Sequence, residues 1–399
     1  MTEPSAFRSE LRAFLAANVP EVLRGRPVLM PAEAAANPEP ADIIAARAKY
    51  LSVMTQRGYT VPRWPKEYGG AGLSADEARI LQDELDALRL APALLGMGVS
   101  MIGPTLLVHG SDAQKQRFLP QIASGAYRFC QGFSEPGAGS DLAALRTSAS
   151  LDASGQRYVI NGSKIWTSGA QHANWIFMLV RTDTSNKHNG ITFILVEMSV
   201  PGIEVKPIRL LSGHSMFCEV FFHDVVAQAS DVVGNVNGGW TVAKTLLGFE
   251  RSGMGAGGVG RRAANSSNEL VVLAKQAVGE HDGMIADGGV RDTVAQLLLD
   301  ELALTLTIER AAASRSATGV AGPEMSLFKL YQSELGQRRD ELALSLRGSD
   351  ALAWEGAGTS PQNTAATRMW LSGKATTIWG GTSEIQRNII AKRILRLPS

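Results

Sequence analysis

The sequence predicts a multi-domain α+β protein in three parts: helices, then a β-rich middle, then helices again. A chain of 399 residues corresponds to roughly two or three domains. The spacing of apolar residues changes from a helical to a strand period near residue 126, and back near residue 233. We therefore predict domains over 1–125, 126–232 and 233–399. Strands and helices do not alternate, so a doubly wound sheet is not expected.

The first 125 residues are predicted to be helical. Phe7, Leu11, Phe14 and Leu15 follow one helix face, and Pro20 marks the end of that helix. Apolar spacing predicts a second helix over Ile43–Gln56. Two more helices are predicted to begin at capping boxes, in which a serine stands three residues before Glu or Gln: Ser74 with Glu77, and Ser111 with Gln114.

The middle region is predicted to form a compact β-barrel or β-sandwich domain. Asn161-Gly162, between Tyr158–Ile160 and Lys164–Trp166, is the strongest type of two-residue hairpin signal. Four more runs are rich in β-branched and aromatic residues and are predicted strands: Trp175–Val180, Ile191–Val196, Glu204–Ile208 and Glu219–Val225. So many short strands within about 100 residues favour one closed or layered β-domain.

Helical spacing returns after Gly239. Pro323 and the stretch Gly356–Pro361 interrupt it. The predicted helical stretches are Trp240–Leu273, Val290–Ala313, Glu324–Leu346 and Ser383–Leu395.

The composition excludes several classes of protein. Apolar residues make up 45% and charged residues 19% of the chain, which is typical of a folded globular protein. A net charge of +1 argues against broad nucleic-acid binding. No apolar run approaches the ~20 residues that a membrane span requires, and the N-terminus lacks the basic start of a signal peptide. We expect a cytoplasmic protein that binds neither nucleic acid nor membranes.

The numbers of cysteines, histidines and glycines bear on which kinds of site are expected. Cys130 and Cys218 are too few for a disulfide framework, and the six histidines show no HExxH pattern. No metal is therefore expected. Glycine is unusually frequent, with 41 residues against a usual share of ~7%. The positions of the glycines therefore bear on function.

Phe133–Asp141, FSEPGAGSD, is a candidate anion-binding loop. Gly137 and Gly139 let backbone N–H groups converge, and Ser140 adds a hydroxyl, as binding of a phosphate or pyrophosphate requires. A plain turn is an equal alternative. Downstream, the segment 164–168, KIWTS, offers an indole and two hydroxyls that suit a flat ring, or it is a half-buried strand with a core tryptophan.

Glu250 is a candidate catalytic carboxylate in a helical stretch. Residues three, four, seven and eight positions later share its helix face, and they are Gly253, Met254, Gly257 and Gly258. A carboxylate above a nearly bare face indicates a groove, whereas the alternative is a solvated pair with Arg251. The same glycines fit GxGxxG, but a dinucleotide fingerprint needs a preceding strand, and helical spacing precedes this one.

Four segments together resemble the acyl-CoA dehydrogenase family: SEPGAGSD, NGSKIWTSGAQHANW, FFHDV and GGTSEIQRNIIAKRIL. They occur in the family's order and spacing along nearly the whole chain. The resemblance implies a C-terminal four-helix bundle, FAD as cofactor and an acyl-CoA substrate. It also implies that electrons pass to electron-transfer flavoprotein.

The resemblance assigns cofactor contacts residue by residue. Phe133 and Ser134 match positions that bind the flavin ring, and Gly139 and Ser140 match the pyrophosphate contacts.

Two more segments are assigned cofactor contacts in the same way. Trp166 matches a tryptophan beside the isoalloxazine, and Ser168 matches a hydroxyl residue near N5, where the family often has Thr. Thr382 and Glu384 match C-terminal positions that approach the cofactor.

The chain departs from the family at the catalytic base. Many members carry the base where this sequence has Gly380, whose N–H remains a candidate donor to the thioester carbonyl. Some long-chain and branched-chain members place the base on a helix at the start of the last domain, and Glu250 matches that site. We therefore predict Glu250 as the base, with Arg251 orienting it or neutralising nearby charge. The bare helix face predicts a bulky or branched acyl group.

A second departure concerns assembly. Homotetrameric members usually carry Arg-x-x-Phe-Gly followed by Gln, which reaches a partner's FAD, and Val278–Val290 has neither. A homo-oligomer that holds the adenosine differently, or an α2β2 hetero-oligomer with a related subunit as in some bacterial steroid-catabolism members, is expected. Two other interpretations stay open: a flavoprotein with desulfinase or oxidase/monooxygenase chemistry, and a non-catalytic subunit that completes a partner's FAD site.

Overall fold

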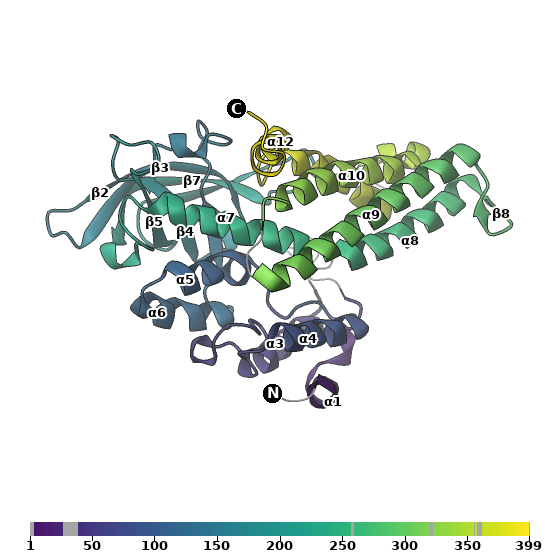
Figure 1. Ribbon diagram of the computed structural model, residues 1–399, viewed down its shortest axis with the longest axis horizontal. Helices are drawn as coiled ribbons and strands as arrows, with labels where there is room; N and C mark the ends of the chain where they lie inside the picture. The colour runs from purple at the N-terminus through teal and green to yellow at the C-terminus, as the bar shows by residue number, and fades with distance from the viewer. Residues whose placement is uncertain are drawn as a thin grey trace. The chain divides into compact units, whose positions relative to one another are not determined.

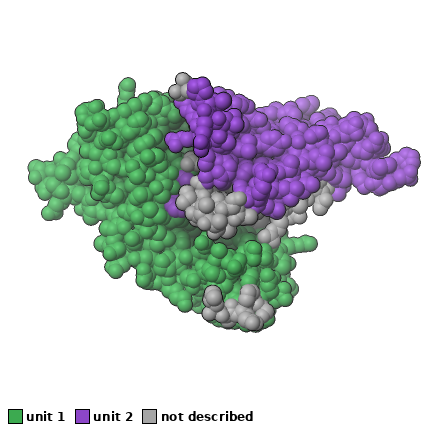
Figure 2. All heavy atoms as spheres, in the orientation of Figure 1, with its two compact units in different colours: residues 1–208, 215–247 green, residues 209–214, 248–399 purple. Residues whose placement is uncertain are grey.

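The computed structural model describes residues 4–26, 39–256, 259–318, 322–354, 356 and 361–398. The chain divides into two compact units, which Figure 2 shows in different colours. The first unit comprises Met1–Ile208 and Ser215–Leu247, and the second comprises Arg209–His214 and Gly248–Ser399. Each unit is described by itself below.

The first unit begins with helices, as predicted. The α-helices before the sheet are α1 (Pro4–Asn18), α3 (Ala41–Gln56), α4 (Ala75–Ala87), α5 (Gly103–His109) and α6 (Asp112–Ala123). Both predicted capping boxes are present: Ser74 caps α4 with Glu77, and Ser111 caps α6 with Gln114. Because each box satisfies backbone N–H groups that have no partner inside the helix, it defines where the helix begins.

A single sheet forms the middle of the first unit (Figure 1). Its strands are β1 (Phe129–Gly132), β2 (Ser148–Leu151), β3 (Arg157–Ser168), β4 (Trp175–Arg181), β5 (Ile191–Glu197), β6 (Ile203–Ile208) and β7 (Phe217–Gln228). They are ordered β1-β4-β2-β3-β7-β6, and β5 pairs with β4. The four predicted strand runs correspond to β4 to β7. The short strands β1 and β2, with sequences FCQG and SASL, were not predicted because they carry few β-branched or aromatic residues.

The predicted hairpin at Asn161-Gly162 is wrong, because both residues lie inside the continuous strand β3. β3 pairs with β2 on one side and β7 on the other, so it does not fold back on itself. A Cβ on Gly162 would lie 2.7 Å from the Thr147 Cα, so the glycine permits close approach of a neighbouring segment. Asn161 bonds Asp224 at a β-bulge instead of making a turn.

The central strands β4 and β5 are buried on both faces. Alternate residues of β4, among them Phe177 and Ile176, enter two different apolar clusters. The first cluster also contains Phe118 from α6 and Leu246 from α7 (Gly239–Ala256). Helices therefore cover one face of the sheet, which gives the strands their near-continuous apolar sequence.

The second unit is helical. After the last part of α7 come α8 (Val259–Val278), α9 (Gly288–Thr318), α10 (Met325–Ser345), α11 (Pro361–Gly373) and α12 (Ser383–Ile389). Two short strands, β8 (Glu280–His281) and β9 (Met284–Ile285), form a hairpin between α8 and α9 (Figure 1). Leu270, Leu297 and Phe328 contribute to one apolar core shared by α8, α9 and α10.

The helices of this region differ from the prediction in two places. The stretch 240–273 is covered by two helices, α7 and α8, and the intervening Gly257 and Gly258 lie outside the described residues. Helix α11 was not predicted because Pro361 was interpreted as a break. Pro361 is the first residue of that helix, a position where its missing N–H costs nothing.

Among the helices described, none is long and apolar enough to cross a membrane. The described residues also contain no group of three or more His, Cys, Asp or Glu side chains that could hold a metal ion.

Candidate active site

The loop that follows β1 has the open backbone expected of an anion-binding site. Glu135 and Ala138 exchange two backbone hydrogen bonds, each 3.0 Å, which fold the chain back at the proline and glycine. A Cβ added at Gly137 or Gly139 would meet nothing within 4 Å. Gly139 and Ser140 are exposed, and their N–H groups donate to no other described residue. The loop therefore presents free N–H donors beside open space.

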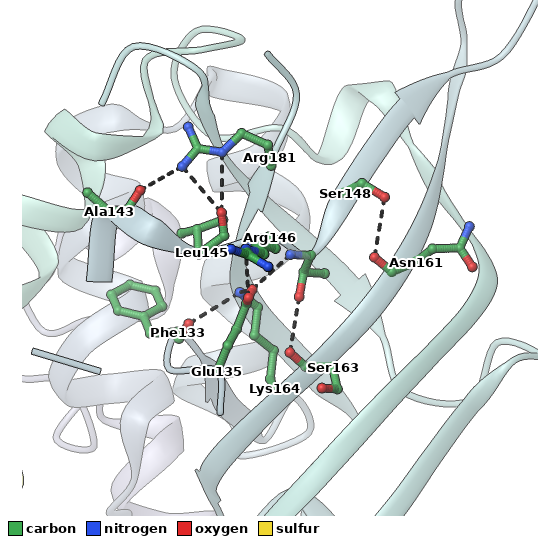
Figure 3. A network of polar contacts seen from close by, with 11 residues as sticks. Phe133, Glu135, Ala143, Leu145, Arg146, Ser148, Asn161, Ser163, Lys164 and Arg181 are labelled. Carbon is green, nitrogen blue, oxygen red and sulfur yellow. Dashed lines mark hydrogen bonds and ion pairs between the residues drawn. The ribbon is translucent and has the colours of Figure 1, made fainter. Parts of the chain in front are cut away.

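A buried ion pair lies beneath this loop (Figure 3). The Lys164 Nζ is 2.7 Å from the Glu135 Oε1 and 3.2 Å from the carbonyl oxygen of Phe133. Glu135 also accepts hydrogen bonds from the backbone N–H groups of Arg146 and Thr147. Neither residue of this pair was predicted to have a role. The detectable signal was a lysine in phase with Tyr158 and Ile160, which are buried positions of the same strand.

Burial and the ion pair shift both titrating groups. Burial lowers the pKa of Lys164 to about 8, against the opposing attraction of Glu135. Burial alone would raise the pKa of Glu135, but Lys164 and the hydrogen bonds from Thr147 and Arg146 outweigh it and lower that pKa. The carboxylate is therefore ionised at neutral pH.

Trp166 occupies a strained position at a β-bulge of β3. Lys164 pairs with Val220 and Thr167 with Cys218, so β3 carries one extra residue at this point. Trp166 has φ +60°, in the left-handed region that non-glycine residues rarely adopt. Its indole is 53% exposed and packs edge-on against Phe217 at 6.1 Å between ring centroids. The bulge turns this aromatic ring outward while Lys164 and Thr167 both stay buried.

The loop and the bulge belong to one local structure. The N–H of Ile165 donates to the carbonyl oxygen of Ser134 at 2.9 Å, and Lys164 bonds the carbonyl oxygen of Phe133. Phe133 is buried against Phe177 and Phe193. Ser168, at the end of β3, is half-buried. The structure thus brings together the predicted residues from 133 to 140 and from 166 to 168.

These residues fit an FAD group. Free N–H groups beside open glycines suit its pyrophosphate, and an exposed indole turned outward by a bulge suits the flat ring system. Ser134 and Ser168 add hydroxyls on the same strand-and-loop structure.

In the second unit, Gly380, Thr382 and Glu384 lie within one short segment at the start of α12. Thr382 caps that helix by accepting from the N–H of Ile385 at 3.3 Å. Gly380 and Gly381 have φ +64° and +92°. The N–H of Gly380 donates to no residue in the described ranges, and this glycine is exposed.

Two buried side chains hold this glycine turn. The Nζ of Lys329, on α10, donates to the Gly381 carbonyl at 2.7 Å, and the Gln386 amide bonds the carbonyls of Gly380 and Gly381. Burial lowers the pKa of Lys329. Glu384 is exposed, and its own backbone N–H and the Thr382 side chain lower its pKa. Lys329 and Gln386 were not identified from the sequence.

Glu250 lies on α7 and is half-buried. Gly253 and Met254 follow it on the same helix, where they share its face by helical geometry. The side chains of Arg251 and Met254, and the residues Gly257 and Gly258, lie outside what the structure describes. Because a helix and not a strand precedes Gly253, the GxGxxG match does not form a dinucleotide fingerprint.

The segment Val278–Val290 contains the β8–β9 hairpin. Asp282 and Gly283 form its turn, both with positive φ. The segment therefore contains a short hairpin whose turn is determined locally.

Three domain families match successive parts of the chain. The family described as acyl-CoA dehydrogenase, N-terminal domain, matches residues 2–126. The corresponding middle domain matches residues 130–225, and the C-terminal domain matches residues 237–395.

Similar proteins cover the whole chain. The acyl-CoA dehydrogenase IpdE1 of Mycolicibacterium smegmatis is 36% identical over 408 aligned positions, covering 100% of this chain and 99% of that protein. The solved structures described as the Tcur3481-Tcur3483 steroid ACAD and as the ChsE4-ChsE5 complex from Mycobacterium tuberculosis each give a TM-score of 0.77. Each is 29% identical and covers 100% of this chain and 98% of the other. With matches to all three domains and a relative of this identity along its full length, the chain belongs to the acyl-CoA dehydrogenase family.

Proposed function

We propose that this acyl-CoA dehydrogenase is an FAD enzyme that desaturates the α,β bond of a bulky acyl-CoA thioester. The observation that carries the cofactor proposal is the exposed loop of free N–H groups at Gly139 and Ser140, joined through β3 to the outward-turned indole of Trp166. Phe133, Ser134 and Ser168 are proposed to contact the flavin ring. Thr382 and Glu384 are proposed as further cofactor contacts on the basis of the family resemblance. FAD, when bound, supplies the acceptor for the hydride that leaves the acyl Cβ.

Glu250 is proposed to remove the α-proton. A proton beside a thioester carbonyl is weakly acidic, so the base must be a partly desolvated carboxylate within reach of it. Glu250 is half-buried on a helix. Gly380 has no side chain to serve as a base, and Arg251 is proposed to balance the charge of Glu250.

The free N–H of Gly380 is proposed to bind the thioester carbonyl oxygen. Negative charge develops on that oxygen as the α-proton leaves, and a preorganised backbone donor stabilises it. Lys329 and Gln386 bond the carbonyls of Gly380 and Gly381, and so hold the turn that carries this N–H.

A bulky acyl group is supported by two independent observations. The chain is similar along its whole length to a structure described as a steroid ACAD. Gly253, Met254, Gly257 and Gly258 share a predicted helix face with Glu250, and three of these four residues have no side chain. We propose that this face lines the acyl pocket.

Electron-transfer flavoprotein is the proposed electron acceptor, and a related subunit is the proposed partner. Two neighbours in structure are described as two-component complexes. The hairpin at 280–285 lacks the residues by which homotetrameric family members are expected to reach a second FAD. Both features favour an α2β2 hetero-oligomer over a homo-oligomer.

Anaerobic titration with a panel of acyl-CoAs tests the activity. A saturated bulky acyl-CoA should bleach the oxidised flavin, and Glu250→Gln should slow bleaching by at least roughly 100-fold, as loss of a general base does. Glu269→Gln is the matched control, since Glu269 is exposed on α8. Bleaching of Glu250→Gln at the wild-type rate would show that another group is the base.

The same titration separates the other chemistries. A desulfinase would leave its flavin unbleached by every saturated acyl-CoA under anaerobic conditions. An acyl-CoA oxidase would be bleached as well, and it is distinguished by rapid reoxidation of the reduced flavin when O2 is admitted. A non-catalytic subunit that only completes a partner's FAD site would leave bleaching of the complex unaffected by Glu250→Gln.

A further inference from the structure

Lys164 is the most completely buried charged side chain among the described residues of the first unit, and the proposed reaction does not use it. It has 0% exposed surface. It is held on β3 two residues before Trp166. Among the described residues, the charged group in contact with it is Glu135, at 2.7 Å. Because transfer of two charges from water costs free energy that their attraction only partly offsets, such a pair is weak support for stability. The placement of the pair therefore calls for another explanation.

The pair is anchored on the carboxylate side. Glu135 accepts from the N–H of Arg146 at 2.7 Å and from that of Thr147 at 2.9 Å, in addition to Lys164 (Figure 3). Three donors fix the carboxylate, so the ammonium has a defined position between Glu135 and the Phe133 carbonyl.

The second contact of Lys164 reaches one particular peptide group. The Phe133 carbonyl, 3.2 Å from the Nζ, belongs to the same amide as the N–H of Ser134. A cation at the oxygen of an amide draws electrons from its nitrogen, and so makes the N–H a stronger donor. That N–H donates to no other residue among those described.

We propose that Lys164 is a positioning residue that polarises the Phe133–Ser134 amide, so that the Ser134 N–H stabilises the reduced form of the bound flavin. The proposal rests on the proposed function, because it requires FAD at this loop. Its consequence is a reduction potential higher than the protein would otherwise give the flavin. The ammonium acts through the peptide and does not touch the cofactor.

The midpoint potential of the FAD-loaded protein tests this. Lys164→Met should shift the equilibrium between oxidised and reduced flavin by roughly tenfold towards the oxidised form, or about 30 mV for a two-electron couple. Lys164→Arg should restore most of the difference, because a guanidinium keeps the charge and the donor. Lys187→Met is the matched control: it removes one exposed positive charge, paired with Asp141 at 2.8 Å, near the same loop.

A second variant keeps the test decisive if Lys164→Met does not fold. The double change Glu135→Gln with Lys164→Met removes both charges and leaves no unpaired ion in the core. It should lower the potential as the single change does. FAD affinity and the thermal midpoint are measured in parallel, since a structural role alone would change these and leave the potential at the wild-type value.

The outcomes separate the two proposals. If wild type binds FAD and is bleached by an acyl-CoA, but Lys164→Met or the double variant keeps its potential, only the role of Lys164 is overturned. An equal shift in Lys187→Met overturns it too, because the effect would then be one of general charge. If wild type binds no FAD in any assembly, the proposed function fails and this inference fails with it.

Discussion

At the scale of single residues, the same residue type serves different purposes in different places. Gly139 leaves space beside a free N–H, whereas Gly162 lets Thr147 approach a strand. Gly380 has a positive φ and an N–H that donates to no described residue. The large number of glycines was evident from composition, but only the surroundings of each one distinguish an open cradle from a close contact.

Replacement of Gly162 by Ala should destabilise the protein. The added Cβ would lie 2.7 Å from the Thr147 Cα, at a backbone φ of +142°, so we expect a loss of roughly 2–4 kcal/mol in the free energy of unfolding. Urea unfolding measures it. Gly155→Ala is the control, because Gly155 also has a positive φ, +71°, but open space at its Cβ, and should cost about 1 kcal/mol. Equal losses in the two variants would mean that backbone strain alone, and not the close contact with Thr147, causes the loss in the free energy of unfolding.

Lys164 should make the free energy of unfolding increase with pH in the alkaline range. Burial lowers its pKa to about 8 in the folded protein from an ordinary 10.5, while Glu135 raises that pKa and Arg181 lowers it. Between these pH values the unfolded chain holds a proton that the folded chain has lost, so raising the pH favours folding.

The unfolding free energies of wild type and Lys164→Met, compared from pH 7.5 to 10.5, measure this effect. As the pH rises, the unfolding free energy of wild type should increase relative to that of Lys164→Met by at most about 3 kcal/mol. This limit follows from about 1.36 kcal/mol for each unit of difference between the folded and unfolded pKa. Lys187→Met should show no such trend. A difference that stays level with pH would mean that Lys164 titrates normally.

At the scale of elements, β3 connects most of the proposed cofactor contacts. One bulge in this strand lets Lys164 and Thr167 stay buried while Trp166 faces outward. A regular strand alternates its side chains, so a residue such as Trp166, two positions after a buried Lys164, would also point inward. The bulge is therefore the local feature that lets this strand present Trp166 to the proposed cofactor site.

The proposed acyl-binding face of helix α7 can be tested by adding a side chain to it. Gly253 lies three residues after Glu250 on this helix, so Gly253→Leu should place volume on the proposed acyl face. We expect kcat/KM for a bulky acyl-CoA to fall at least roughly tenfold, with little change for a short-chain substrate. Leucine favours a helix over glycine by about 0.8 kcal/mol, so lost stability would not explain the result.

Gly336→Leu provides the comparison for this variant. Gly336 lies on α10 with open space at its Cβ, and it gains the same helix propensity away from α7. Equal loss across acyl sizes in Gly253→Leu would contradict the pocket assignment.

At the scale of the whole molecule, the main question is assembly. We predict that the chain purified from its own cells is accompanied by a related acyl-CoA dehydrogenase subunit, with less than one FAD per chain when it is isolated alone. Native mass spectrometry and flavin absorbance give the composition and the FAD content. A homomeric assembly with one FAD per chain would contradict the hetero-oligomer and favour a different adenosine site within this chain.

The sequence by itself determined the fold class, the family motifs and most element positions. Amphipathic spacing, capping boxes and apolar strand runs act over a few residues, so helices such as α4 and strands such as β4 were predictable. Asn161-Gly162 was misinterpreted because its local preference for a turn is overridden by pairing of β3 with β2 and β7. The pairing of Lys164 with Glu135, 29 residues apart, and the bulge that exposes Trp166 were decided only by tertiary structure. Such contacts depend on strand register and burial, which arise from the packing of distant segments and leave no periodic pattern in the chain.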